Sequence, residues 1–340
     1  MDKSTLRIVF MGTPEFAVES LQTLVEGRYN VVAVVTQPDK PVGRHQDTLQ
    51  ASPVKRYALE HSIPVLQPVK MKDESFIEQL RSFNADIQAV VAFRMLPEVV
   101  WGMPRFGTFN VHAALLPQYR GAAPINWAVI NGETQTGVTT FFLDKDIDTG
   151  RIIDKKTFDI PDDADVEYVY DGLMRLGAQL CKETIDKVIE CDGDVPSVAQ
   201  EDNDCLKPAP KIFKETCEIN WNQSAKQVYD FIRGLSPYPG AWSSLEQSVE
   251  ASTKNKLVLK VFKTAKTGRS TGQKAGTIMV EGKRMFVACA DEWLEIVNLQ
   301  ISGKKRMNAN DFLNGMRTIE DYHCTKYNNY ETSRRYKECS

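Results

Sequence analysis

The chain has 340 residues, with 42% apolar and 26% charged side chains, an ordinary composition for a globular protein. Its length exceeds what one hydrophobic core usually supports, so we expect two domains. No apolar run reaches 18 residues and the start lacks the layout of a secretory signal, which argues against membrane-spanning and secreted classes and predicts a cytoplasmic protein with no membrane partner.

The net charge of −3 conceals an uneven distribution along the chain. Residues 1–206 hold 20 Lys and Arg against 31 Asp and Glu, a net of −11, whereas residues 207–340 hold 22 against 14, a net of +8. A basic domain attracts polyanions. The second part is therefore expected either to bind a phosphate-rich partner or to carry a solvated basic surface.

The seven cysteines are widely spaced, form no CxxC pair and are accompanied by only four histidines. An odd count without paired spacing favours reduced thiols over a disulfide framework. The same lack of closely spaced Cys and His predicts that the protein holds no metal.

The first part of the chain alternates apolar runs with segments of helical periodicity. Residues 6–11 are an apolar run, and Pro14 stands where a helix commonly begins. The alternation predicts an α/β fold with a parallel sheet covered on both faces, whose ligands bind beyond the carboxyl ends of the strands. Further strands are expected at 29–36, 63–66 and 87–93, and helices at 54–60 and 74–83.

Composition also suggests where the domains end. Apolar residues at helical steps through 166–188 predict a long helix that closes a first domain of residues 1–190. Residues 191–210 are polar and interrupted by prolines, as in a linker. We expect a second domain at 211–317 and a polar tail at 318–340.

The second domain is expected to be mostly β-structure. A predicted helix at 227–233 is followed by short β-rich runs separated by Gly or Asp turns. Several short strands at this spacing predict a small barrel or sandwich. The runs lie at 256–262, 276–280, 284–289 and 293–299.

Three polar residues follow the strands of the first domain. Asn110 and His112 are two apart in an extended run, so their side chains project from the same face. Asp148 lies 36 residues after His112, behind a β-branched run and before the turn-forming Gly150. A neighbouring strand could therefore return Asp148 to His112.

An amide, an imidazole and a carboxylate are the groups that acyl transfer to an amine requires. Asn110 can donate a hydrogen bond to the oxygen that gains negative charge. His112 can carry the proton of the amine to the departing nitrogen, while Asp148 orients the ring and favours its charged form. Taken alone, His112 could be a buried structural histidine and Asp148 a turn-forming aspartate. The combination with Asn110 predicts catalysis.

The run NVHAALLPQYRGAAPIN, together with DIDTG, resembles the signature of the methionyl-tRNA formyltransferases, within the wider class of 10-formyltetrahydrofolate-dependent transferases. Further matches lie in register over nearly the whole chain. They include MGTPEFAVESL, TQPDKPVGR and SPVK in the first part, and IRGLSPYPGAW, GKKRM and FLNG in the second.

The resemblance implies a Rossmann-like N-terminal catalytic domain and a C-terminal OB-like β-barrel. It implies transfer of a formyl group from the co-substrate 10-formyltetrahydrofolate to the amino group of initiator methionyl-tRNA, with Asn110, His112 and Asp148 as the catalytic residues. We expect the protein to act as a monomer.

The same resemblance implies a set of folate-binding residues. One chain segment would lie against the folate, and an apolar cluster would lie near the pterin. The segment is Ala114, Leu115, Leu116 and Pro117, and the cluster is Phe93, Met95 and Leu96.

Contacts with tRNA are expected in both domains. The resemblance implies that the loop after the second strand enters the acceptor end with Arg44, although this loop reads GRHQD, with a single arginine and an acidic Asp47. In the basic second domain, phosphate contacts would position the tRNA without reading its bases. The residues expected to make them are Lys304, Lys305 and Arg306.

Three other functions compete with this interpretation. A dinucleotide-dependent dehydrogenase is disfavoured because MGTPEF lacks the GxGxxG spacing that accommodates a pyrophosphate. A formyltransferase for a small amine, such as glycinamide ribonucleotide or an amino sugar nucleotide, leaves the charge of +8 on the second part unexplained. A non-catalytic RNA-binding module leaves the three polar residues unexplained.

Overall fold

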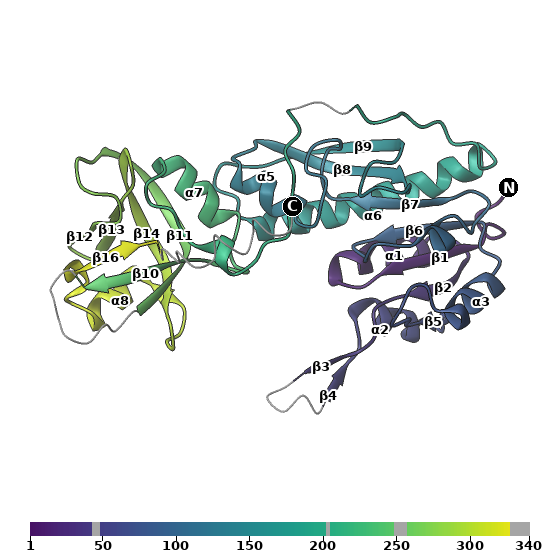
Figure 1. Ribbon diagram of the computed structural model, residues 1–340, viewed down its shortest axis with the longest axis horizontal. Helices are drawn as coiled ribbons and strands as arrows, with labels where there is room; N and C mark the ends of the chain where they lie inside the picture. The colour runs from purple at the N-terminus through teal and green to yellow at the C-terminus, as the bar shows by residue number, and fades with distance from the viewer. Residues whose placement is uncertain (43–47, 202–204, 248–256, 327–340) are drawn as a thin grey trace, which may run out of the picture. The chain divides into compact units, whose positions relative to one another are not determined.

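The computed structural model describes residues 1–42, 48–201, 205–247 and 257–326 (Figure 1). The chain forms two compact units. The first contains residues 1–125, 134–161 and 168–210, and the second contains residues 126–133, 162–167 and those from 211 onward. Two short segments of the predicted first domain thus join the second unit.

The first unit contains a mixed seven-stranded sheet of Rossmann-like architecture, in the order β5-β2-β1-β6-β7-β8-β9. The five strands from β5 to β7 are parallel, as predicted. The last two extend the sheet differently, because β8 is antiparallel to both of its neighbours. The strands are β1 Ile8–Gly12, β2 Val31–Val35, β5 Val65–Leu66, β6 Ile87–Val91, β7 Thr108–His112, β8 Gln135–Phe142 and β9 Ile152–Asp159.

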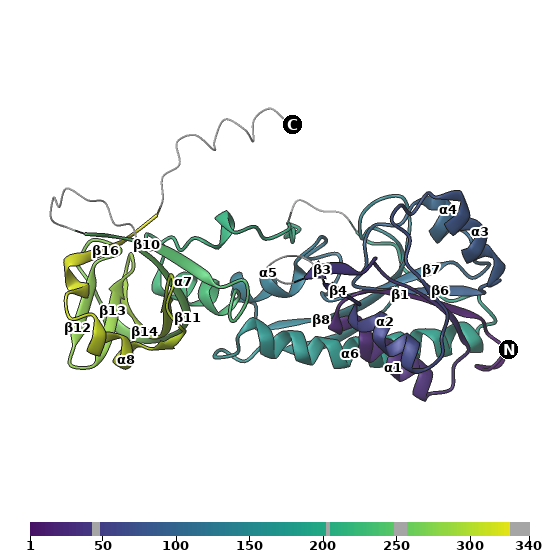
Figure 2. The same ribbon diagram turned by 90° about the horizontal axis from the view of Figure 1, so that it is seen from below.

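Helices cover both faces of this sheet. All five residues of β1 are buried, as expected for a strand packed on both sides. Figure 2 shows α3 and α4 on one side of the sheet and α1 on the other. The α2 N-terminus is capped by Ser52, whose side chain accepts from the Lys55 amide at 3.0 Å. The helices of the first unit are α1 Glu15–Glu26, α2 Pro53–Glu60, α3 Glu74–Ser82, α4 Glu98–Trp101 and, for most of its length, α6 Val166–Glu190, and β3 Lys40–Val42 pairs antiparallel with β4 Thr48–Gln50. Helix α5 Pro124–Ile130 lies mainly in the second unit.

The second unit is built on an antiparallel sheet in the order β12-β13-β14-β11-β10-β16, with β15 beside β14. The sheet curls back on itself, and an isolated bridge between Thr277, just before β12, and His323 in β16 joins its two edges. Its strands are β10 Ala241–Gln247, β11 Leu257–Ser270, β12 Ile278–Glu281, β13 Arg284–Ala288, β14 Glu292–Ile301, β15 Met307–Asn308 and β16 Tyr322–Thr325; its helices are α7 Ala225–Arg233 and α8 Ala309–Gly315.

The prediction of a polar tail at 318–340 is wrong for the first residues of that range. Strand β16 pairs with β10, and the side chains of Ile319 and Cys324 are buried. Tyr322 also packs against the core of the second unit, while the rest of this described segment is polar. Composition therefore gave no signal for the last strand of the sheet.

Buried charges explain why residues 162–167 belong to the second unit. Arg233 on α7 donates to the Ala164 carbonyl and to the Asp230 carboxylate, both at 2.8 Å. Both charged side chains are less than a tenth exposed. A buried guanidinium needs such partners, because an unpaired charge in the interior is strongly unfavourable.

Two features are missing from the ranges that the structure describes. None of the helices in these ranges combines the length and the apolar composition that crossing a lipid bilayer demands. In the same ranges, no three or more His, Cys, Asp and Glu side chains gather in a way that could hold a metal ion.

Candidate functional site

Asn110 and His112 lie on β7, between the parallel strand β6 and the antiparallel strand β8. Asn110 faces Val90 and Phe141 in the two ladders. Its side chain is half-buried, and within the described ranges it has no hydrogen-bond partner. The amide group is thus held on a rigid strand with its donors free for a ligand.

The two ring nitrogens of His112 face different groups. Nε2 lies 2.9 Å from the Tyr119 carbonyl oxygen, and Nδ1 lies 3.8 Å from Oδ2 of Asp148. A carbonyl only accepts hydrogen bonds, so Nε2 carries a proton. In the neutral ring Nδ1 then carries the lone pair, and it faces the Asp148 carboxylate on a side chain that is 6% exposed.

Asp148 is held in an unusual backbone conformation. It lies in the loop between β8 and β9 with φ of 56°, a left-handed value that costs non-glycine residues energy. Its Oδ2 accepts a hydrogen bond of 2.9 Å from the Gly121 amide. A Cβ at Gly121 would lie 2.5 Å from the Ala209 carbonyl, so a side chain there would displace the donor.

The segment that contains Ala114, Leu116 and Pro117 is fixed to β8 and β9. Thr139 donates to the Ala114 carbonyl at 2.7 Å and accepts from the Leu116 amide at 3.1 Å. The Lys155 amine donates to the Leu116 carbonyl, and burial lowers the pKa of that amine. Ala114 and Leu116 are buried, while Leu115 and Pro117 are half-buried.

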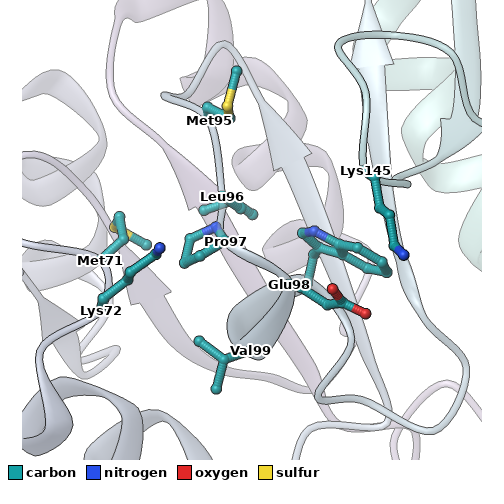
Figure 3. A pocket seen from close by; sticks show the side chains of 9 residues that line it. Met71, Lys72, Met95, Leu96, Pro97, Glu98, Val99 and Lys145 are labelled. Atoms are coloured by element: carbon teal, nitrogen blue, oxygen red, sulfur yellow. The ribbon is translucent and has the colours of Figure 1, made fainter.

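A groove of about 690 Å³ lies in the first unit at the carboxyl end of β6 (Figure 3). Two of the predicted folate residues, Met95 and Leu96, line it, whereas Phe93 does not. The Phe93 ring instead packs against the core cluster under β6. The lining residues are Met71, Lys72, Met95, Leu96, Pro97, Glu98, Val99, Trp101 and Lys145.

Figure 3 shows Lys72 and Lys145 on opposite sides of the stretch from Met95 to Glu98. Neither lysine has an ion-pair partner in the described part of the chain. Lys145 belongs to the same loop as Asp148. The groove therefore combines apolar walls with two ammonium groups and the carboxylate of Glu98, and it adjoins the loop that carries Asp148.

Of the residues predicted to contact tRNA, the structure describes three. Arg44 lies outside the described residues. Lys304, Lys305 and Arg306 are exposed on the turn between β14 and β15. The Arg306 guanidinium lies 4.3 Å from the centre of the Phe262 ring and donates to Asn298, which leaves the two lysines as the less constrained cations.

Sequence reasoning missed the groups that hold the site together. The Tyr119 carbonyl and the Gly121 amide are main-chain atoms, which no residue type reveals. Thr139 and Lys155 reach the site from β8 and β9, the next two strands of the same sheet. The one available signal was the glycine of the RGAAP run, since a glycine often marks a close approach of two backbones.

The chain is similar to known formyl transferases in both units. Residues 6–185 match the family described as "Formyl transferase", and residues 211–317 match "Formyl transferase, C-terminal domain". The methionyl-tRNA formyltransferase of Parabacteroides distasonis is 56% identical over 327 residues, which are 95% of this chain and 99% of that protein. The protein of the same name from Bacteroides fragilis is 55% identical over 326 residues, 95% and 98% of the two chains.

Solved structures share the fold at low sequence identity. The sugar 3N-formyl transferase WlaRD, crystallised in the presence of dTDP and 5-N-formyl-THF, is 18% identical with a TM-score of 0.62, over 88% of this chain and 99% of that one. The N-formyltransferase from Helicobacter canadensis, in complex with folinic acid and dTDP-3-aminofucose, is 20% identical with a TM-score of 0.62, over 90% and 100%.

Proposed function

Because this chain belongs to the methionyl-tRNA formyltransferase family, we propose that it transfers the formyl group of 10-formyltetrahydrofolate to the amino group of initiator methionyl-tRNA. The observation that carries the proposal is 56% identity along 99% of a relative of that name, through both units. The product, N-formylmethionyl-tRNA, would serve the initiation of translation.

The geometry of β7 and the Asp148 loop supports the chemical roles proposed for three side chains. Transfer forms a bond from the methionyl nitrogen to the formyl carbon and breaks the bond from that carbon to the folate nitrogen. Asn110 would stabilise the charge that gathers on the formyl oxygen. Nδ1 of His112 would take the amine proton and return it to the leaving nitrogen, while Asp148 stabilises the ring in its charged state.

The groove at the carboxyl end of β6 supports a folate site in the first unit. Met95 and Leu96 supply apolar surface, as a pterin and its aromatic linker require. Folates end in glutamate carboxylates, and Lys72 and Lys145 offer the complementary charge. Ala114, Leu115, Leu116 and Pro117 are proposed as the wall nearest the reacting carbon. Phe93 packs on the core cluster that also contains Leu96, and it would support the groove from the core.

The charge of the second part supports a tRNA partner over a small acceptor. We propose phosphate contacts by the exposed turn with Lys304, Lys305 and Arg306, and a contact of Arg44 with the acceptor end. Action as a monomer stays a prediction.

A comparison of acceptors tests this proposal. The full chain is assayed for formyl transfer from 10-formyltetrahydrofolate to initiator methionyl-tRNA, glycinamide ribonucleotide and an amino sugar nucleotide. We expect kcat/KM for the tRNA to exceed that for either small amine by at least about 10³-fold, a difference that many charged contacts can supply. If kcat/KM for a small amine were equal to or higher than that for the tRNA, the small amine and not methionyl-tRNA would be the substrate.

Removing the two groove lysines should weaken folate binding without slowing the chemical step. In K72Q/K145Q, we expect the KM for a polyglutamylated 10-formyltetrahydrofolate to rise about 5- to 25-fold, since each charge pair contributes about 1 kcal/mol in water. The KM for a folate with a single glutamate should rise less. Lys70 is exposed and does not line the groove, so K70Q is the matched control. An unchanged KM in the double variant would place the folate tail elsewhere.

A further inference from the structure

Gln200 lies in the segment that composition marked as a linker, yet its side chain contacts the loop of Asp148. Gln200 Nε2 donates to the Asp148 carbonyl and to the Gly150 carbonyl, each at 2.8 Å. The residue is half-buried in the first unit. One amide group thus bridges the main chain on both sides of Thr149.

The orientation of this amide is fixed by Arg120. Gln200 Oε1 accepts from Arg120 Nε at 3.1 Å and from its terminal nitrogen at 2.9 Å. A guanidinium only donates and a carbonyl only accepts, so a flipped amide would face like groups on both sides. Arg120 therefore holds the two N–H groups of Gln200 toward the loop.

The backbone around Gln200 is itself docked on the first unit. Val198 and Ile152 exchange two main-chain hydrogen bonds of 2.8 Å, and Arg151 Nε donates to the Ser197 hydroxyl at 3.0 Å. These bonds place Gln200 next to the start of β9 without touching Asp148. The contact with Asp148 is made by the Gln200 side chain alone among the described residues of this segment.

The loop requires an external hold because of its conformation and exposure. Residues 144–147 are exposed, and Asp148 follows them with a left-handed backbone. Such a residue persists only where its surroundings determine it, and here the surroundings are the Gly121 amide on the side chain and Gln200 on the main chain. Loss of one hold would let the carboxylate drift from Nδ1 of His112.

We propose that Gln200, oriented by Arg120, is a positioning residue that fixes the Asp148 carboxylate against His112. The effect of Gln200 on catalysis rests on the proposed function. Its effect on the position of Asp148 does not. Gln200 touches no reacting atom. It acts through Asp148, so its contribution should vanish when Asp148 is absent.

Amide exchange tests the structural content without any substrate. The Gly121 N–H is protected by its bond to Asp148 Oδ2. In Q200M, which keeps the side-chain length but removes both donors, we expect Gly121 exchange to accelerate at least about fivefold. S197A, which removes a bond of the same segment away from Asp148, should leave it within about twofold. Unchanged exchange in Q200M, or equal acceleration in S197A, would overturn the proposal.

A double-mutant cycle tests the catalytic consequence in the full chain. Q200M should lower kcat for formyl transfer about 10- to 100-fold with KM nearly constant, because a small misplacement of a catalytic group has that effect. In a D148A background the same change should cost less than about twofold. Equal losses in both backgrounds would show a merely structural role. If Q200M fails to fold, Q200E takes its place, because it keeps an acceptor for Arg120. If the unmodified protein itself transfers no formyl group, that result refutes the proposed function and not the positioning role.

Discussion

Replacing His112 with alanine should lower kcat for formyl transfer by on the order of 10²- to 10⁴-fold, the usual contribution of a general acid–base group. The ring is buried, its Nε2 is fixed by the Tyr119 carbonyl, and Nδ1, which faces Asp148, is the nitrogen proposed to exchange a proton with the reactants. KM for both substrates should change little, because the proton transfer belongs to the transition state. Single-turnover formylation of methionyl-tRNA measures the effect.

Two further variants separate chemistry from structure at this position. H112Q can still donate to the Tyr119 carbonyl but has no nitrogen that titrates, so it should lose as much activity as H112A. The control is H61A. The His61 ring stacks on Tyr57 at the end of α2, and the variant that lacks it should keep full activity. Near-normal turnover in H112Q would remove proton transfer by His112 from the mechanism.

The elements that sequence predicted are those with a strong apolar pattern. The strand expected at 87–93 is β6, and the helix expected at 166–188 is α6. Strand β9 was missed because it exposes one face and carries Asp, Lys and Thr. Strand β11 continues well past the predicted 256–262, since pairing with β14 supports polar residues that propensity alone would not.

The catalytic candidates could be predicted because their chemistry resides in side chains. The 36-residue separation of His112 and Asp148 was bridged by β8, which lies beside β7 as the sequence suggested. What fixes these side chains could not be predicted. The Tyr119 carbonyl and the Gly121 amide are main-chain groups, and Gln200 lies in a stretch whose polar composition is typical of a linker.

Replacing Asn110 should lower both kcat and kcat/KM by about 10²- to 10³-fold, the loss usually seen when one donor to a developing oxyanion is removed. The side chain is half-buried on β7, two residues from His112, and in the described structure its amide donates to no other group. Its donors are therefore available without first breaking a bond. Folding should be unaffected, since no internal hydrogen bond is lost.

Two substitutions distinguish this role from simple substrate binding. N110D preserves size but presents a carboxylate where an oxyanion forms, so it should be slower than N110A. N222A, at an exposed asparagine of the second unit, is the control and should behave as the unmodified protein. If N110A instead raised KM with kcat unchanged, Asn110 would hold the ground-state substrate and the stabilisation of the transition state would have to come from another donor.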